Sequence, residues 1–215
     1  MKNTELRKKL IGSAKMLVNA GLNSSTWGNL SVRGLREGSF LVTPSGMDYD
    51  LVTPEDIVEV SLDGEVLDGR RKPSSETPMH ALFYRERPQI NAVVHTHSTY
   101  ATTMAVLKWE IPPVISELAH GVGGSVPVAD YAAAGTEHLG KGALQAMGPK
   151  LAVLLQNHGM VALGCYLEDA VRLAFIVENA ARIYYLARVA GEPTIVPEQA
   201  LEEMCRGFYC SYGQK

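Results

Sequence analysis

Residues 90–98 read INAVVHTHS, an apolar segment that ends in two histidines one residue apart. The apolar run predicts a buried strand over 90–94 that delivers both histidines. Side chains two positions apart lie on the same face of a strand, so His95 and His97 can reach one metal ion. Such a pair is weak evidence by itself, because two polar residues at the end of a strand give the same pattern.

A third histidine follows another apolar segment. His158 stands in the turn Asn157-His158-Gly159, directly after a strand predicted at 151–155. Ends of strands in one sheet can converge although they are distant in the sequence. Three imidazoles leave one position of a tetrahedral zinc site open for water or substrate, whereas structural zinc sites take four protein ligands rich in cysteine. Three nitrogen ligands favour Zn²⁺ over magnesium or calcium, and another divalent ion stays an alternative.

Short polar segments upstream can bind an anion. Residues 72–80 read KPSSETPMH and predict a helix that begins near Ser75 and carries Glu76 in its first turn. Two serine hydroxyls beside the free amides of a helix N-terminus form an anion site, although an ordinary capped helix start gives the same pattern. The segments Thr43-Pro44-Ser45-Gly46 and Gly28-Asn29 have the same two interpretations, a simple turn or part of a phosphate cradle.

Composition limits the class of protein. The chain has 215 residues, of which 46% are hydrophobic and 20% charged, with a formal net charge of −3, which predicts one globular domain over 1–215. It lacks the basic field that nucleic acid or an anionic membrane requires of a partner. It also offers no run of about 18 apolar residues that could span a membrane. The three cysteines form no CxxC motif and are too few for a disulfide framework, so we expect free thiols and a cytoplasmic protein.

Periodicity and turn signals predict a mixed α/β chain whose early sheet is antiparallel, because Asp63-Gly64 is a strong hairpin dipeptide. The Pro- and Gly-rich stretch 111–135 predicts surface segments without a long helix. The expected helices cover 4–20, 75–87, 100–107, 136–147 and 167–188, and the expected strands cover 30–32, 40–43, 57–60, 65–67, 90–94, 126–129, 151–155 and 160–163.

Five motifs in register resemble the class II aldolase/adducin family, most closely its ketose-1-phosphate aldolases of the fuculose-1-phosphate type. The motifs are Gly28-Asn29, Thr43-Pro44-Ser45-Gly46, Pro73-Ser74-Ser75-Glu76, His95-Thr96-His97-Ser98 and Asn157-His158-Gly159. The resemblance covers nearly the whole chain. It implies a three-layer α/β/α domain around a largely antiparallel sheet, assembled as a homotetramer with active sites between subunits.

The resemblance also implies roles for individual residues. His95, His97 and His158 become zinc ligands and Glu76 the catalytic acid/base, while the substrate phosphate is held by Gly28, Asn29, Ser45, Gly46, Ser74 and Ser75. The implied reaction is the retro-aldol cleavage of a ketose-1-phosphate to dihydroxyacetone phosphate and a short aldehyde. Candidate substrates are the 1-phosphates of fuculose, ribulose, 5-deoxyribulose and methylthioribulose.

One family residue has no counterpart here. The family's tyrosine that protonates the leaving aldehyde oxygen aligns with Ser116, and the segment around it contains no tyrosine. Glu117, His120 or a bound water would have to serve instead, or the aldehyde half of the substrate differs. The family's second tyrosine, in a C-terminal tail, has its match in Tyr212.

Related reactions remain as alternatives, because fold and metal do not fix the chemistry. They are those of a ribulose-5-phosphate 4-epimerase, a keto-sugar-phosphate decarboxylase and a methylthioribulose-1-phosphate dehydratase. A non-enzymatic adducin-like binding protein is disfavoured, because all three metal ligands are present. His80 lies four residues after Glu76 on the same helical face and can either orient it or simply pack, and His138 is interpreted as an ordinary helix residue.

Overall fold

Eight strands form one sheet in the computed structural model of the chain, which describes residues 3–206. Their order is β4-β3-β2-β1-β5-β8-β7-β6, and every neighbouring pair is antiparallel except β6 with β7. The strands are β1 Asn29–Arg33, β2 Ser39–Val42, β3 Val58–Ser61, β4 Val66–Asp68, β5 Ala92–Thr96, β6 Val128–Ala129, β7 Ala152–Leu155 and β8 Gly159–Gly164.

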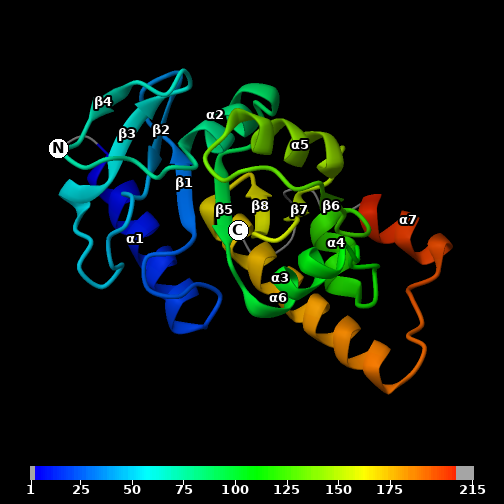
Figure 1. Cartoon of the computed structure of the whole chain (residues 1–215). Helices are drawn as coiled ribbons and strands as arrows, with labels where there is room; N and C mark the ends of the chain where they lie inside the picture. The colour runs from blue at the N-terminus through cyan, green and yellow to red at the C-terminus, as the bar shows by residue number, and fades with distance from the viewer. Residues whose placement is uncertain (1–2, 207–215) are drawn as a thin grey trace.

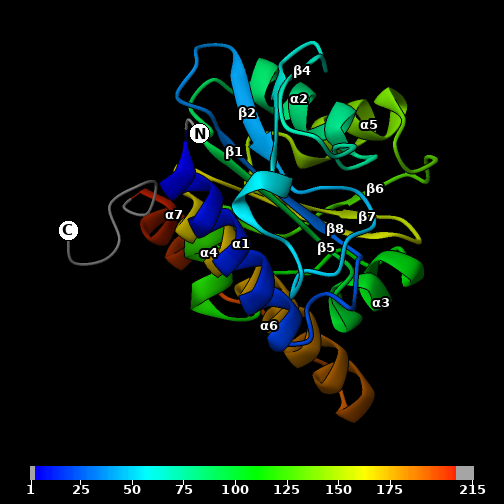
Figure 2. The same cartoon turned by 90° about the vertical axis from the view of Figure 1, so that its left-hand side faces the viewer.

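Helices cover both faces of this sheet, which gives three layers (Figures 1 and 2). One face carries α2 Thr77–Glu86 and α5 Glu137–Met147, and the other carries α1 Thr4–Asn19, α3 Thr99–Leu107, α4 Ser116–Val122 and α6 Leu167–Ala190. Each face buries its own apolar cluster, because strand side chains alternate between the two faces of the sheet. The expected α/β/α architecture with a largely antiparallel sheet is confirmed.

The strand β5 lies between β1 and β8 in the middle of the sheet, and all five of its residues are buried. Its register pairs His95 with Asn29 of β1 on one side and with Val161 of β8 on the other. Segments far apart in the sequence therefore meet at the end of β5, where the two histidines of the opening segment stand.

The stretch 111–135 differs from the prediction of surface segments. Ser116–Val122 forms the helix α4, whose Leu118, Ala119 and Val122 are fully buried. A helix of seven residues is too short to show a clear period in the sequence, and its apolar side is defined by packing against α6. The helix α7, Glu198–Arg206, was not expected either and lies against α4.

Two further findings concern the expected free thiols and the expected absence of a membrane span. Cys165 is disulfide-bonded, so the expectation of free thiols is wrong for this cysteine. Within residues 3–206, no helix is both long enough and apolar enough to cross a membrane.

The start of α3, just beyond the two histidines, is held by a carboxylate from α6. The two oxygens of Glu178 accept hydrogen bonds from the backbone N–H groups of Tyr100 (2.9 Å) and Ala101 (2.8 Å). These N–H groups have no partner inside their own helix, and a negative charge is favourable at a helix N-terminus. Glu178 thus fixes the chain immediately after the segment that carries His95 and His97.

We expect Glu178→Ala to lower the free energy of unfolding by about 2–4 kcal/mol, because the backbone N–H groups of Tyr100 and Ala101 lose a charged acceptor. Glu178→Gln keeps one acceptor oxygen and should lose roughly half as much. Urea unfolding followed by circular dichroism measures both variants. Glu192→Ala, an exposed acid just after α6, is the control and should shift stability by less than about 0.5 kcal/mol. Equal stability of Glu178→Ala and this control would contradict the capping role.

Candidate metal centre

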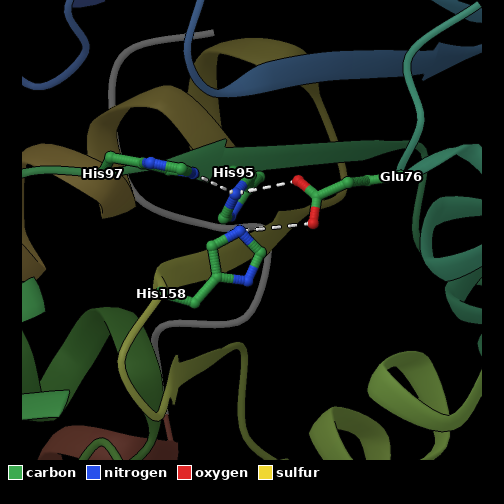
Figure 3. Close-up of side chains that lie close together, drawn as sticks. All are labelled: Glu76, His95, His97 and His158. Atoms are coloured by element: carbon green, nitrogen blue, oxygen red, sulfur yellow. Dashed lines mark hydrogen bonds and ion pairs between the residues drawn. The ribbon is translucent and has the colours of Figure 1, made fainter. Parts of the chain in front are cut away.

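Four side chains from three separate segments converge at one end of the central strands (Figure 3). His95 and His97 stand at the end of β5, and His158 stands in the β7–β8 turn. Glu76 is the residue directly before α2. One ligand atom from each side chain lies within 4.8 Å of those of the others. His95 Nε2 is 2.8 Å from His97 Nε2 and 2.9 Å from Glu76 Oε2, and His158 Nε2 is 3.4 Å from Glu76 Oε1.

The β7–β8 turn carries His158 close to β5. Asn157 takes the left-handed conformation (φ 57°), which asparagine tolerates better than most residues, and the His158 N–H donates to the Leu155 carbonyl. At Gly159, a Cβ atom would lie 2.3 Å from the Thr96 carbonyl oxygen. Only glycine permits this approach, and it brings the rings of His158 and His95 to a centroid distance of 4.8 Å.

His97 follows the last residue of β5 and is held from the other side by a loop. Its backbone N–H donates to Asn23 Oδ1 (3.1 Å), and its ring lies 5.5 Å from that of the exposed Trp27. Gly28 has φ 73°, and a Cβ there would collide with the Asn23 side chain. Sequence analysis did not identify Asn23 or Trp27, because their role depends on a loop from another part of the chain and neither belongs to a recognisable motif.

The hydrogen bonds of His95 fix how its ring serves the cluster. Its Nδ1 lies 2.9 Å from the Met160 carbonyl oxygen, so Nδ1 carries the proton that it donates there. The Nε2 lone pair then points toward His97 and Glu76. A histidine that donates its other ring nitrogen to a backbone carbonyl is the usual arrangement of a metal-bound imidazole.

The residues present fit a divalent metal ion. Three neutral imidazole nitrogens and a carboxylate oxygen are a donor set that zinc and similar ions accept. Among the described residues, the buried Oε1 of Glu76 has no hydrogen-bond partner, and a cation between the four side chains would satisfy it. The cluster is also more than a set of exposed acids, because His95 is fully buried and Glu76 nearly so.

Electrostatics and burial favour an ionised Glu76 carboxylate and neutral imidazoles at His97 and His158. Burial alone would raise the pKa of the Glu76 carboxyl, but His95 and His158 and the amide of Asn29 hold it well below its ordinary range. Burial, together with its two histidine neighbours, lowers the pKa of His97 to about 3, and burial likewise lowers that of His158. Burial opposes protonation of His95, but the Glu76 carboxylate beside it raises its pKa.

The polar segments noted in the sequence lie beside Glu76. Asn29 Nδ2 donates to Glu76 Oε2 (2.9 Å), and the backbone N–H of Glu76 donates to Ser74 Oγ (3.2 Å). Residues 43–46 and 72–76 run side by side, joined by bonds from Ser45 N–H to the Lys72 carbonyl and from Ser74 N–H to the Thr43 carbonyl. Of the six candidate phosphate residues, Asn29 and Ser74 are buried, and three are exposed, namely Ser45, Gly46 and Ser75. The structure thus places Asn29 and Ser74 against Glu76, and it joins the segment of Ser45 and Gly46 to the segment of Ser74 and Ser75.

The tentative residues lie elsewhere. Glu117 is exposed in the first turn of α4, and His120, expected in a loop, stands near the end of that helix with Nδ1 2.9 Å from the Met204 carbonyl oxygen of α7. Neither belongs to the metal cluster. Tyr212 lies outside the described residues. His138 is exposed on α5, as an ordinary helix residue would be, whereas His80 is fully buried.

Comparisons with known proteins agree with this geometry. A 5-deoxy-D-ribulose 1-phosphate aldolase of Bacillus thuringiensis serovar kurstaki is 42% identical over 209 residues, which cover 97% of each chain. A 5-methylthioribulose-1-phosphate/5-deoxyribulose-1-phosphate aldolase of Rhodospirillum rubrum is 40% identical, over 94% of this chain and 90% of that protein. A solved L-fuculose 1-phosphate aldolase matches with a TM-score of 0.93 and 39% identity, over 97% of this chain and 98% of that one.

The model of the "Class II Aldolase and Adducin N-terminal domain" family matches residues 8–185, a span that includes all four cluster residues and the polar segments beside them. The resemblance that the five motifs indicated is confirmed, and the chain belongs to the class II aldolase and adducin family.

Proposed function

We propose that this protein is a metal-dependent aldolase, a lyase that cleaves a ketose-1-phosphate to dihydroxyacetone phosphate and a short aldehyde. The observation that carries the proposal is the meeting of three imidazoles and one carboxylate beside a hydroxyl- and amide-rich surface. Family membership supports it, and so do the aldolase names of the relatives. Zinc is the proposed metal, because three imidazole ligands favour it over magnesium or calcium.

Among the candidate substrates, we favour 5-deoxyribulose-1-phosphate and 5-methylthioribulose-1-phosphate. Two relatives at 40–42% identity carry these sugars in their names, and their matches span at least nine-tenths of both chains. A solved fuculose-1-phosphate aldolase matches at 39% identity. The missing tyrosine near Ser116 is a further departure from the fuculose-1-phosphate type.

In this reaction His95, His97 and His158 hold the metal, and Glu76 moves the proton. A bound divalent ion stabilises the negative charge that develops on the substrate oxygens as the carbon–carbon bond breaks. Glu76 gives a proton to the nucleophilic carbon of the three-carbon half in cleavage and removes it in the reverse reaction. Asn29 donates to one oxygen of this carboxylate and so restricts its rotation. No lysine Schiff base is needed.

The phosphate of the three-carbon half is assigned to the neutral groups beside Glu76. Ser45, Gly46 and Ser75 are exposed and can reach a ligand, while the buried Asn29 and Ser74 fix the local backbone. Backbone N–H groups and hydroxyls hold an anion without a positive side chain. Such contacts hold the reacting carbon next to Glu76. Holding the two groups in this geometry lowers the barrier to proton transfer.

For the proton that the hydroxyl next to the breaking bond loses in cleavage, and that the aldehyde oxygen regains in the reverse reaction, we propose Glu117 as acceptor and donor in place of the family tyrosine. Its carboxylate is exposed at the start of α4, whereas Nδ1 of His120 is engaged with α7. An exposed acid that lies outside the metal cluster of its own chain can serve the site of a neighbouring copy. The assembly we propose for this is a cytoplasmic homotetramer with active sites between subunits.

A coupled assay for dihydroxyacetone phosphate, run with the four candidate ketose-1-phosphates, tests the proposed function. We expect product from at least one of them, with the 5-deoxy or 5-methylthio sugar turned over fastest. Treatment with a chelator should abolish turnover, and one equivalent of zinc should restore it, because three imidazole ligands lose their ion. Turnover that survives complete metal removal, or a product other than dihydroxyacetone phosphate, would contradict the proposal.

Glu76→Gln separates proton transfer from metal binding. We expect turnover to fall by about a thousandfold or more, since the amide cannot accept the proton, while the three histidines keep the metal. Turnover and metal content per chain are measured on the same sample. Glu137→Gln, an exposed acid paired with Lys141 on α5, is the matched control and should keep wild-type turnover. Unchanged activity of Glu76→Gln would remove Glu76 from the mechanism.

A further inference from the structure

A buried polar chain lies beside Glu76 that the proposed reaction does not use. Ser31 of β1, with its Oγ fully enclosed, lies 2.6 Å from His80 Nδ1 and 2.8 Å from the Tyr84 hydroxyl. His80 and Tyr84 stand one turn apart on α2 and are 0% and 1% exposed. The other ring nitrogen of His80, Nε2, is buried and has no hydrogen-bond partner among the described residues. A buried histidine with an unpartnered nitrogen calls for an explanation.

The hydrogen bonds of this chain can run in only one direction that satisfies both hydroxyl protons. If Tyr84 donates to Ser31 and Ser31 donates to His80 Nδ1, each hydroxyl proton has an acceptor. If His80 Nδ1 were the donor, one of the two buried hydroxyl protons would have none, which is unfavourable. Ser31 and Tyr84 therefore keep Nδ1 as an acceptor, and the His80 proton stays on Nε2.

The place of His80 on α2 puts its ring on the same helical face as the Glu76 side chain. His80 follows Glu76 by four residues, its backbone N–H donates to the Glu76 carbonyl (3.2 Å), and side chains at this spacing share one helical face. Side chains on a helix also lean toward its N-terminus, which here is Glu76. Burial lowers the pKa of His80 to about 3, so its ring is neutral at physiological pH. The structure has no hydrogen bond between His80 Nε2 and Glu76 among the described residues. A neutral N–H donor on this helical face can form one with the carboxylate without cancelling its charge.

We propose that His80 is a positioning residue. Ser31 and Tyr84 keep its ring proton on Nε2, and this Nε2–H fixes the Glu76 carboxylate in the orientation for proton transfer. Two buried acceptor atoms of neighbouring side chains, Glu76 Oε1 and Asn29 Oδ1, have no hydrogen-bond partner among the described residues, and Oε1 also lies 3.4 Å from His158 Nε2. Asn29 orients Glu76 from β1, and His80 does so from within α2. The inference rests on the proposed function, because it assigns Glu76 the proton transfer.

Two amide substitutions of His80 distinguish the roles of its two ring nitrogens. The shorter side chain of His80→Asn places its amide near Nδ1, so it keeps a partner for Ser31 and offers nothing at Nε2. The longer His80→Gln places an N–H donor near Nε2. Both are neutral and polar, so they differ mainly in the donor that the proposal invokes.

The readout is the exchange of the carbon-bound proton of dihydroxyacetone phosphate with deuterated water, followed by NMR without any aldehyde. This partial reaction isolates the Glu76 step from cleavage and product release. In the zinc-loaded protein, we expect His80→Asn to slow exchange by about ten- to a hundredfold, the usual effect of losing an orienting partner, with KM for the ketose-1-phosphate unchanged. His80→Gln should stay within a few-fold of wild type, and both should keep wild-type zinc content.

A second variant acts on the same chain without touching His80. Ser31→Ala removes the donor that keeps Nδ1 an acceptor, so the ring can change its tautomer, and exchange should slow several-fold with zinc content unchanged. This variant keeps the proposal testable if His80→Asn fails to fold.

The outcomes are distinguishable. Wild-type exchange in His80→Asn would overturn the positioning role. An equal loss in His80→Asn and His80→Gln, accompanied by a lower melting temperature or lost zinc, would show a packing role and overturn it as well. Absence of exchange in the wild-type protein would overturn the proposed function itself, and this role with it.

Discussion

The close approach of Gly159 to the carbonyl of Thr96 is the constraint on which the rest of the site depends. It lets the β7–β8 turn press against the end of β5, because a Cβ at this position would lie 2.3 Å from that oxygen. His158 thereby reaches His95, and the pairing of β5 with β1 brings Asn29 and the polar loops to the same place. The central sheet therefore gathers ligands that are 63 residues apart in number, from His95 to His158, at a single point.

The charge of the chain and its proposed phosphorylated substrate fit together. A net charge of −3 gives no general attraction for an anion. The surface beside Glu76 offers hydroxyls and backbone N–H groups. In the proposed reaction, neutral donors hold the phosphate locally and add no charge next to the metal cluster or the Glu76 carboxylate. The imidazoles of His97 and His158 can then stay neutral, as metal binding requires.

Local patterns predicted most elements, because the strands and long helices carry clear periodicities and turn residues. The pairing of His95 with His97 followed from the alternation of a strand, and the convergence of His158 from the way strand ends meet. The short helix α4 was missed because seven residues show no period and its apolar side faces α6. The sequence left open whether His80 orients Glu76 or simply packs, and the contacts of Asn23, Trp27 and Ser31 could not be predicted, since they depend on distant segments.

X-ray absorption spectroscopy of the zinc-loaded protein tests the central claim most directly, because outer-shell scattering counts the imidazoles around the ion. The account predicts one zinc per chain with three imidazole ligands and the remaining ligands oxygen. In His158→Ala, one imidazole should disappear from the spectrum, whereas in His138→Ala, the exposed histidine of α5, all three should remain. Fewer than three imidazoles in the wild-type protein, or an unchanged spectrum in His158→Ala, would contradict it.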